Sequence, residues 1–123
     1  MEKTEKIVWG WETQLDLHDC NVEMIDDEAA VQRYARELVV LIDMVPYGEP
    51  MTPRFGFACP ATAGLSLTQL LETSLLSAHF SPSTQCAFIN IFSCKIYNPE
   101  TVRDFSIKFF GAKDCTLHFL ERY

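Results

Sequence analysis

Four side chains that can do chemistry lie within one apolar stretch, residues 64–94. They are the hydroxyls of Ser66 and Ser74, the imidazole of His79 and the thiol of Cys94. A hydroxyl can act as a nucleophile, an imidazole as a general base and a thiol as a proton donor. Each of these residue types is also common as an ordinary buried side chain, so the spacing between them has to carry any functional prediction.

Composition limits the classes of function. A chain of 123 residues is expected to form one domain, here residues 1–123, large enough for a core of its own. The net charge of −7 disfavours nucleic-acid binding, which needs clustered Lys and Arg. No apolar run approaches the twenty residues of a transmembrane helix. We therefore expect a protein that binds neither nucleic acid nor membrane.

The five cysteines predict a cytoplasmic protein with free thiols. Their number is odd, and the sequence contains no Cys-x-x-Cys pair and no Cys/His cluster. A disulfide framework and a zinc site are both disfavoured by this pattern, and we expect no bound metal. Free thiols are typical of a reducing compartment.

The order of hydrophobic patterns predicts an α+β fold. An amphipathic helix is expected from Asp26 or Asp27 to about Met44, and a second helix from Asn98 to Gly111. Strands are expected at 7–17, around 54–59, and at 65–71, 73–80, 86–96 and 116–120. Segregated strands with two helices indicate a two-layer sandwich, in which two helices cover one face of a mainly antiparallel sheet.

Four short motifs in this stretch resemble a known family. They are Gly64-Leu65-Ser66, Thr73-Ser74-Leu75, His79 to Ser83, and Phe92-Ser93-Cys94. Together they are similar to the Gly-x-Ser, Glu-Ser-His, His-Thr-Trp-Pro-Glu and Phe-Thr-Cys elements of the small prokaryotic type of S-adenosylmethionine decarboxylase. The spacings between the four motifs agree with that family without any insertion. The segment Leu15 to Cys20 also resembles the family's Val-Asp-Leu-Tyr-Gly-Cys.

The resemblance implies a self-processing, pyruvoyl-dependent decarboxylase. Cleavage between Thr73 and Ser74 would turn Ser74 into a pyruvoyl cofactor, with Ser66 and His79 assisting the processing. The pyruvoyl group would form a Schiff base with the substrate amine, and Cys94 would return a proton after CO₂ leaves. The implied reaction is decarboxylation of S-adenosylmethionine for spermidine synthesis, in a cytoplasmic homodimer with its site near the subunit interface.

The departures from the family pattern leave alternatives open. Thr73 and Leu75 stand where the family has Glu and His beside the processing serine, and Ser81 and Ser83 stand where it has the Trp and Glu that help hold the nucleoside. The same chemistry could therefore act on arginine or ornithine. Alternatively, an unprocessed chain could bind a ligand or partner without catalysis. Trp9 and Trp11 are expected to be core or dimer contacts.

Overall fold

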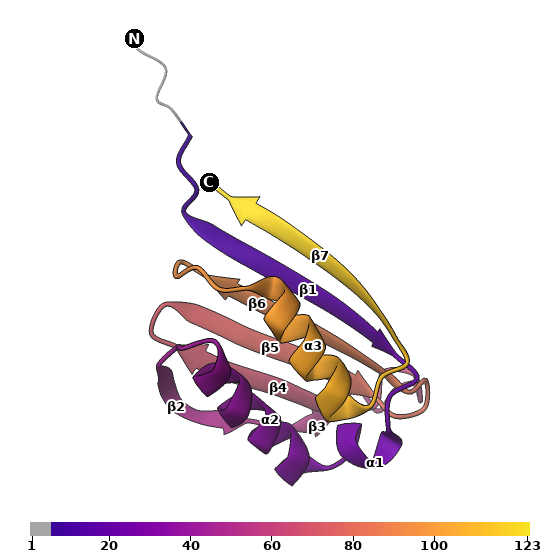
Figure 1. Cartoon of the computed structure of the whole chain (residues 1–123). Helices are drawn as coiled ribbons and strands as arrows, with labels where there is room; N and C mark the ends of the chain where they lie inside the picture. The colour runs from indigo at the N-terminus through magenta and orange to yellow at the C-terminus, as the bar shows by residue number, and fades with distance from the viewer. Residues whose placement is uncertain (1–5) are drawn as a thin grey trace.

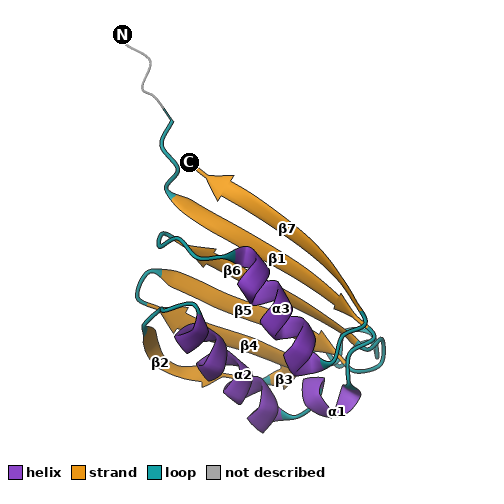
Figure 2. Ribbon diagram, in the orientation of Figure 1, coloured by secondary structure: helices purple, strands orange, loops and turns teal. Residues whose placement is uncertain are grey.

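The computed structural model describes residues 6–123 as one antiparallel sheet with helices on one of its faces. The six strands of the main path run in the order β2-β4-β5-β6-β1-β7, and β3 pairs with β4 beside that path. Figures 1 and 2 show α2 and α3 lying side by side across this face. The expected α+β class, with a mainly antiparallel sheet, is confirmed.

The first half of the chain supplies β1, which lies next to one edge of the sheet, and the two strands that pair with the outer side of β4 at the other edge. Its elements are β1 (Gly10–His18), α1 (Val22–Ile25), α2 (Glu28–Leu41), β2 (Pro46–Met51) and β3 (Arg54–Phe55). Asp27 caps α2 by accepting a hydrogen bond from the backbone N–H of Ala29. β2 and β3 both pair with β4, so this half of the chain folds back onto the strands that follow it.

The second half forms an antiparallel meander that ends in a helix and an edge strand. Its elements are β4 (Gly64–Leu71), β5 (Ser74–Ser81), β6 (Cys86–Ser93), α3 (Pro99–Phe110) and β7 (Asp114–Arg122). Asn98 accepts N–H groups at the start of α3, Pro99 follows it, and Gly111 ends the helix at φ 64°. β1 lies between β6 and β7, which places the first and last strands side by side.

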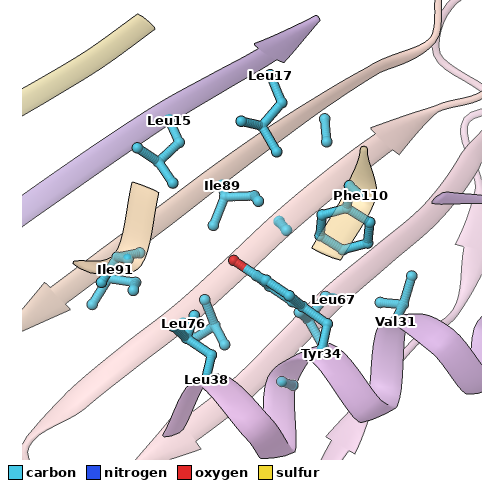
Figure 3. Close-up of a cluster of buried hydrophobic side chains, with 14 of the residues drawn as sticks. Leu15, Leu17, Val31, Tyr34, Leu38, Leu67, Leu76, Ile89, Ile91 and Phe110 are labelled. Carbon is cyan, nitrogen blue, oxygen red and sulfur yellow. The ribbon is translucent and has the colours of Figure 1, made fainter. Parts of the chain in front are cut away.

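The core lies between the sheet and the two long helices. Alternate strand residues point to it, among them Leu15, Leu67, Leu76 and Ile89, while Tyr34 and Phe110 reach it from the helices (Figure 3). The Tyr34 hydroxyl bonds to Ser106 Oγ at 2.6 Å, and burial raises the pKa of the tyrosine. This hydrogen bond ties α2 to α3 without leaving a buried polar atom unpaired.

Several predicted boundaries were wrong. The first strand begins at Gly10 rather than residue 7, and α2 ends at Leu41 because Asp43 takes a positive φ before Met44 packs into the core. The strand expected at 54–59 is only Arg54–Phe55, since the chain turns away after Gly56 at φ 82°. The short helix α1 and the edge strand β2 were not predicted.

Among the described residues, no helix is long and apolar enough to cross a bilayer.

Gly64 is required at the start of β4 because the backbone of Phe80 comes close to it. A Cβ at this position would lie 2.1 Å from the Phe80 carbonyl oxygen. We predict that Gly64→Ala lowers the free energy of unfolding by about 3 kcal/mol, as in severe overpacking. Gly48→Ala is the control, since a Cβ there meets nothing within 4 Å and its φ of +75° costs only about 1–2 kcal/mol. Equal urea midpoints for the two variants would contradict this.

Candidate active site

The backbone between Thr73 and Ser74 lies in a tight turn at one end of the sheet. Leu71 of β4 pairs with Ser74 of β5, so Glu72 and Thr73 alone connect the two strands. The turn is anchored next to the start of β2, because the N–H of Glu72 donates to the carbonyl of Val45 at 3.0 Å, beside the Pro46–Leu71 pair. The peptide bond predicted to break is therefore held in a defined position by its neighbours.

The carbonyl oxygen of Thr73 receives two donors from Cys94. The backbone N–H of Cys94 donates to it at 3.0 Å, and the Cys94 thiol at 3.3 Å. Donors fixed on a carbonyl oxygen stabilise the negative charge that develops there when a nucleophile attacks its carbon. The arrangement can thus act as an oxyanion site on the residue that precedes Ser74.

The Ser74 hydroxyl has one ordinary and one weak hydrogen-bond partner. Its Oγ is 3.0 Å from Thr73 Oγ1 and 3.2 Å from Met44 Sδ, and a thioether sulfur is a poor acceptor. Met44 had no signal in the sequence, because its contact with Ser74 depends on how α2 packs against the β4–β5 turn.

The segment that carries Cys94 is held by hydrogen bonds. Ser93 Oγ accepts the N–H of Lys95 and donates to the Lys95 carbonyl. The Tyr97 hydroxyl is 2.6 Å from Thr13 Oγ1 inside the core, where burial raises the pKa of Tyr97 to about 12. Cys94 itself is exposed, so its thiol can meet a ligand while its backbone stays fixed.

Ser66 and His79 form a second pair at the other end of β5. The two residues are directly opposite in the β4–β5 ladder, with Ser66 Oγ 2.8 Å from His79 Nδ1. His79 Nε2 lies 3.0 Å from the carbonyl oxygen of Thr62. A carbonyl only accepts, so Nε2 carries a proton, and in the neutral form of the imidazole Nδ1 then accepts the Ser66 hydroxyl.

The loop before β4 fixes this histidine. Ser81 Oγ donates to the carbonyl of Ala61 at 2.7 Å and Ser83 Oγ to that of Pro60 at 2.8 Å, next to the Thr62 carbonyl. Both serines occupy positions at which the family that this sequence resembles has Trp and Glu. Thr62 was missed by sequence reasoning because it acts through its backbone carbonyl, and no residue type signals that contact.

The four predicted residues therefore form two pairs and not one cluster. Ser74 and His79 are five positions apart on one strand, which is about 16 Å at ~3.3 Å per residue. They also fall on opposite faces of the sheet, because strand side chains alternate. Within one chain, the His79 imidazole cannot reach Ser74.

The comparisons with known proteins identify the family. The model of the S-adenosylmethionine decarboxylase family matches residues 11–123. The chain belongs to this family. Its fold is similar to the crystal structure of the adenosylmethionine decarboxylase from Aquifex aeolicus VF5, with a TM-score of 0.77 and 18% identity over 94% of this chain and 91% of that one. No curated protein sequence matches the chain.

The candidate site offers groups for proton transfer rather than for metal binding. Within residues 6–123, no group of three or more His, Cys, Asp or Glu side chains is placed to hold a metal ion. The groups of the family motifs that could take part in the family's reaction are the hydroxyls, the imidazole and the thiol described above.

The tautomer of His79 is a direct test of the Ser66–His79 geometry. We predict that ¹⁵N–¹H correlation spectra of the imidazole show neutral His79 protonated at Nε2, because Thr62 supplies only an acceptor. Ser66→Ala removes the donor to Nδ1 and should leave this tautomer in place while shifting the Nδ1 resonance. A spectrum of the unsubstituted protein with the proton on Nδ1 would contradict the arrangement.

Proposed function

We propose that this chain is a self-processing, pyruvoyl-dependent decarboxylase that acts on S-adenosylmethionine. The observation that carries the proposal is the pair of Cys94 donors on the Thr73 carbonyl, immediately before the candidate precursor Ser74. Membership of the family supports a decarboxylase. Thr73 stands where the resembling family has Glu, and its hydroxyl is within hydrogen-bond distance of Ser74 Oγ.

These positions support the following cleavage chemistry. Ser74 Oγ attacks the Thr73 carbonyl carbon, and the Cys94 N–H stabilises the oxygen as it gains negative charge. The C–N bond then breaks and leaves an ester. Removal of the Ser74 α-proton expels the Thr73 carboxylate, and one water replaces the nitrogen, which leaves as ammonia. The products are a chain of residues 1–73 and a second chain that begins with a pyruvoyl group at position 74.

The base for this proton transfer comes from a second copy of the chain in our proposal. Ser74 and His79 of one chain are about 16 Å apart along β5, but a two-fold axis across the middle of β5 reverses the strand of the second copy. Because the faces without helices meet, the imidazole of the second copy approaches the backbone of the turn from the side opposite the Ser74 side chain. Such an axis sets the Ser66–His79 pair of one subunit over the Thr73–Cys94 end of the other. Each homodimer then holds two shared sites of identical composition.

The sheet face opposite the helices is the surface that this homodimer would cover. It carries the exposed side chains of Leu70, Leu75 and Phe88, and the stacked rings of Trp9 and Phe92, whose centroids are 5.9 Å apart. Trp9 is 62% exposed in the isolated chain. Sheets that pack face to face bury such side chains at a spacing of about 10 Å. The expectation that Trp9 is a dimer contact belongs to this proposal.

The same geometry supports a role for each residue in turnover. The pyruvoyl carbonyl supplies an electron sink for the carbanion left by decarboxylation. Cys94 is exposed and contacts the Thr73 carbonyl next to position 74, which supports our assignment of its thiol as the group that returns a proton to the substrate carbon. Ser66 positions the His79 imidazole and transfers its hydroxyl proton along their 2.8 Å contact.

Ser81 and Ser83 favour a second candidate substrate. Their hydroxyls donate to the Pro60–Ala61 backbone instead of lying free for a nucleoside. A smaller cationic amino acid, arginine or ornithine, would need no nucleoside contact and would suit a chain of net charge −7. Release of labelled CO₂ from S-adenosylmethionine, arginine and ornithine separates the two candidates, and activity on S-adenosylmethionine alone eliminates the second.

Intact mass spectrometry tests self-cleavage. We predict that the purified protein gives two fragments divided between Thr73 and Ser74, and that Ser74→Ala stays whole because it lacks the nucleophile. Cys94→Ala should cleave about tenfold more slowly, since it loses a weak thiol donor but keeps the backbone N–H.

The same spectra separate the remaining alternative. If the unsubstituted chain keeps its full mass after prolonged incubation, it is the unprocessed, non-catalytic homologue. Circular dichroism of each variant serves as the control for folding, because a misfolded chain would also stay whole.

A further inference from the structure

β7 forms an edge of the sheet, with one side open along nine residues. In the strand order β2-β4-β5-β6-β1-β7 it pairs only with β1, and within residues 6–123 no strand lies on its outer side (Figure 1). A long unpaired edge presents backbone N–H and C=O groups to any other strand. We propose that this edge pairs with β7 of a second copy of the chain, in addition to the contact made by the open sheet face.

The backbone pattern shows which residues of β7 point outward. The carbonyl of Arg122 accepts the N–H of Trp9, so Arg122 directs its backbone toward the β1 side. Backbone groups alternate along a strand, so those of Cys115, Leu117, Phe119 and Glu121 face the open side. A second β7 must therefore place these outward residues opposite one another, which allows only registers that shift in steps of two.

One of these registers is self-complementary in charge. With a two-fold axis beside His118, Asp114 of each copy lies opposite Arg122 of the other, and Leu117 lies opposite Phe119. Opposite charges and apolar pairs across antiparallel strands are both favourable. A shift of two residues in one direction sets Arg122 opposite Thr116, and the same shift in the other direction sets Asp114 opposite Leu120. Either shift loses both Asp114–Arg122 pairs. The charges and apolar residues of β7 thus favour antiparallel pairing with β7 of a second copy in this register.

The side chains in question are available for this contact. Phe119 is 40% exposed and Asp114 is exposed, with no ion pair to any residue that the structure describes. Arg122 bonds to Glu12 at 2.6 Å while its side chain remains 55% exposed, so it can bridge Glu12 and an Asp114 of the second copy. The edge contact therefore adds two ion pairs, one at each end of the interface, and breaks none.

This contact is separate from the one proposed for catalysis. It continues the sheet sideways, whereas the shared-site homodimer stacks two sheets face to face. Both can exist in one assembly of four chains, and the edge contact does not depend on cleavage or on the identity of the substrate. Its success or failure therefore leaves the proposed function unaffected.

A designed disulfide tests the register. Glu121 would lie opposite Cys115 of the second copy, at the Cα separation of about 5.5 Å that a disulfide accepts. Within one chain, these residues are six positions apart on a strand, about 20 Å, which is too far for a bond. Diamide, which takes up the two electrons of the thiols, should link Glu121→Cys into covalent dimers, with Cys115 joined to the introduced cysteine in the peptide map.

The matched control is Glu121→Cys combined with Cys115→Ser, which should not form this dimer. Residues 115 and 121 both point to the helix side of the sheet, so the face-to-face contact cannot produce a disulfide between them. Unsubstituted protein, oxidised in parallel, accounts for links through the exposed Cys59 and Cys94. Failure of Glu121→Cys to join Cys115, in protein whose circular dichroism shows it folded, overturns the proposed register.

Charge exchange gives an independent readout by sedimentation. Asp114→Arg and Arg122→Asp each set like charges against one another at both ends of the interface, and each should weaken the edge association about tenfold or more. The double variant restores opposite pairs and should sediment like the unsubstituted protein, even though it still lacks the Arg122–Glu12 bridge. If all four proteins sediment alike, the edge of β7 does not bind a second copy.

Discussion

The antiparallel register of β4, β5 and β6 is the constraint on which the candidate site depends. It sets Ser66 opposite His79, and it sets Ser74 opposite Ser93, the residue before Cys94. A shift of one residue in either ladder would turn these side chains to the other face. The two-residue turn at Glu72–Thr73 and the close approach of Gly64 to Phe80 hold this register in place.

The same register separates the two halves of the chemistry. In the proposed mechanism, attack and oxyanion stabilisation belong to the turn and Cys94, while the hydroxyl–imidazole pair lies at the far end of the same strand. The shared site that we propose requires a second copy on the sheet face that the helices leave open, where apolar side chains are exposed. In our proposal, self-cleavage depends on assembly, and an isolated chain stays whole.

Much of the architecture could be predicted because its signals are local. Asn98, Pro99 and Gly111 mark both ends of α3 by their own conformational preferences, and the structure confirms that helix. The alternation in β1 and the apolar run of β6 likewise indicated strands. β2 was missed because Pro46 and Gly48 read as a loop, and its pairing with β4 depends on where α2 ends. Asp43 sets that end through a positive φ that periodicity does not reveal.

The site was predictable as a set of residues but not as a geometry. The motif spacing named Ser66, Ser74, His79 and Cys94, and their roles remain predictions. The structure joins Ser66 to His79, and Cys94 to the carbonyl before Ser74. Spacing along the chain could not show that these pairs lie at opposite ends of β5. Backbone groups such as the Thr62 carbonyl and the Cys94 N–H carry no signal in the sequence, because every residue has them.

Complementation between two inactive chains tests the shared site most directly. His79→Ala keeps Ser74 but lacks the base, and Ser74→Ala keeps the base but has nothing to cleave. Each alone should stay whole, since loss of a general base costs about 10²–10⁴ in rate. Co-expressed with distinct tags, the two should form mixed pairs in which only the His79→Ala chain splits before Ser74. If that chain stays whole in mixed pairs, or cleaves alone at the unsubstituted rate, the site is not shared between subunits.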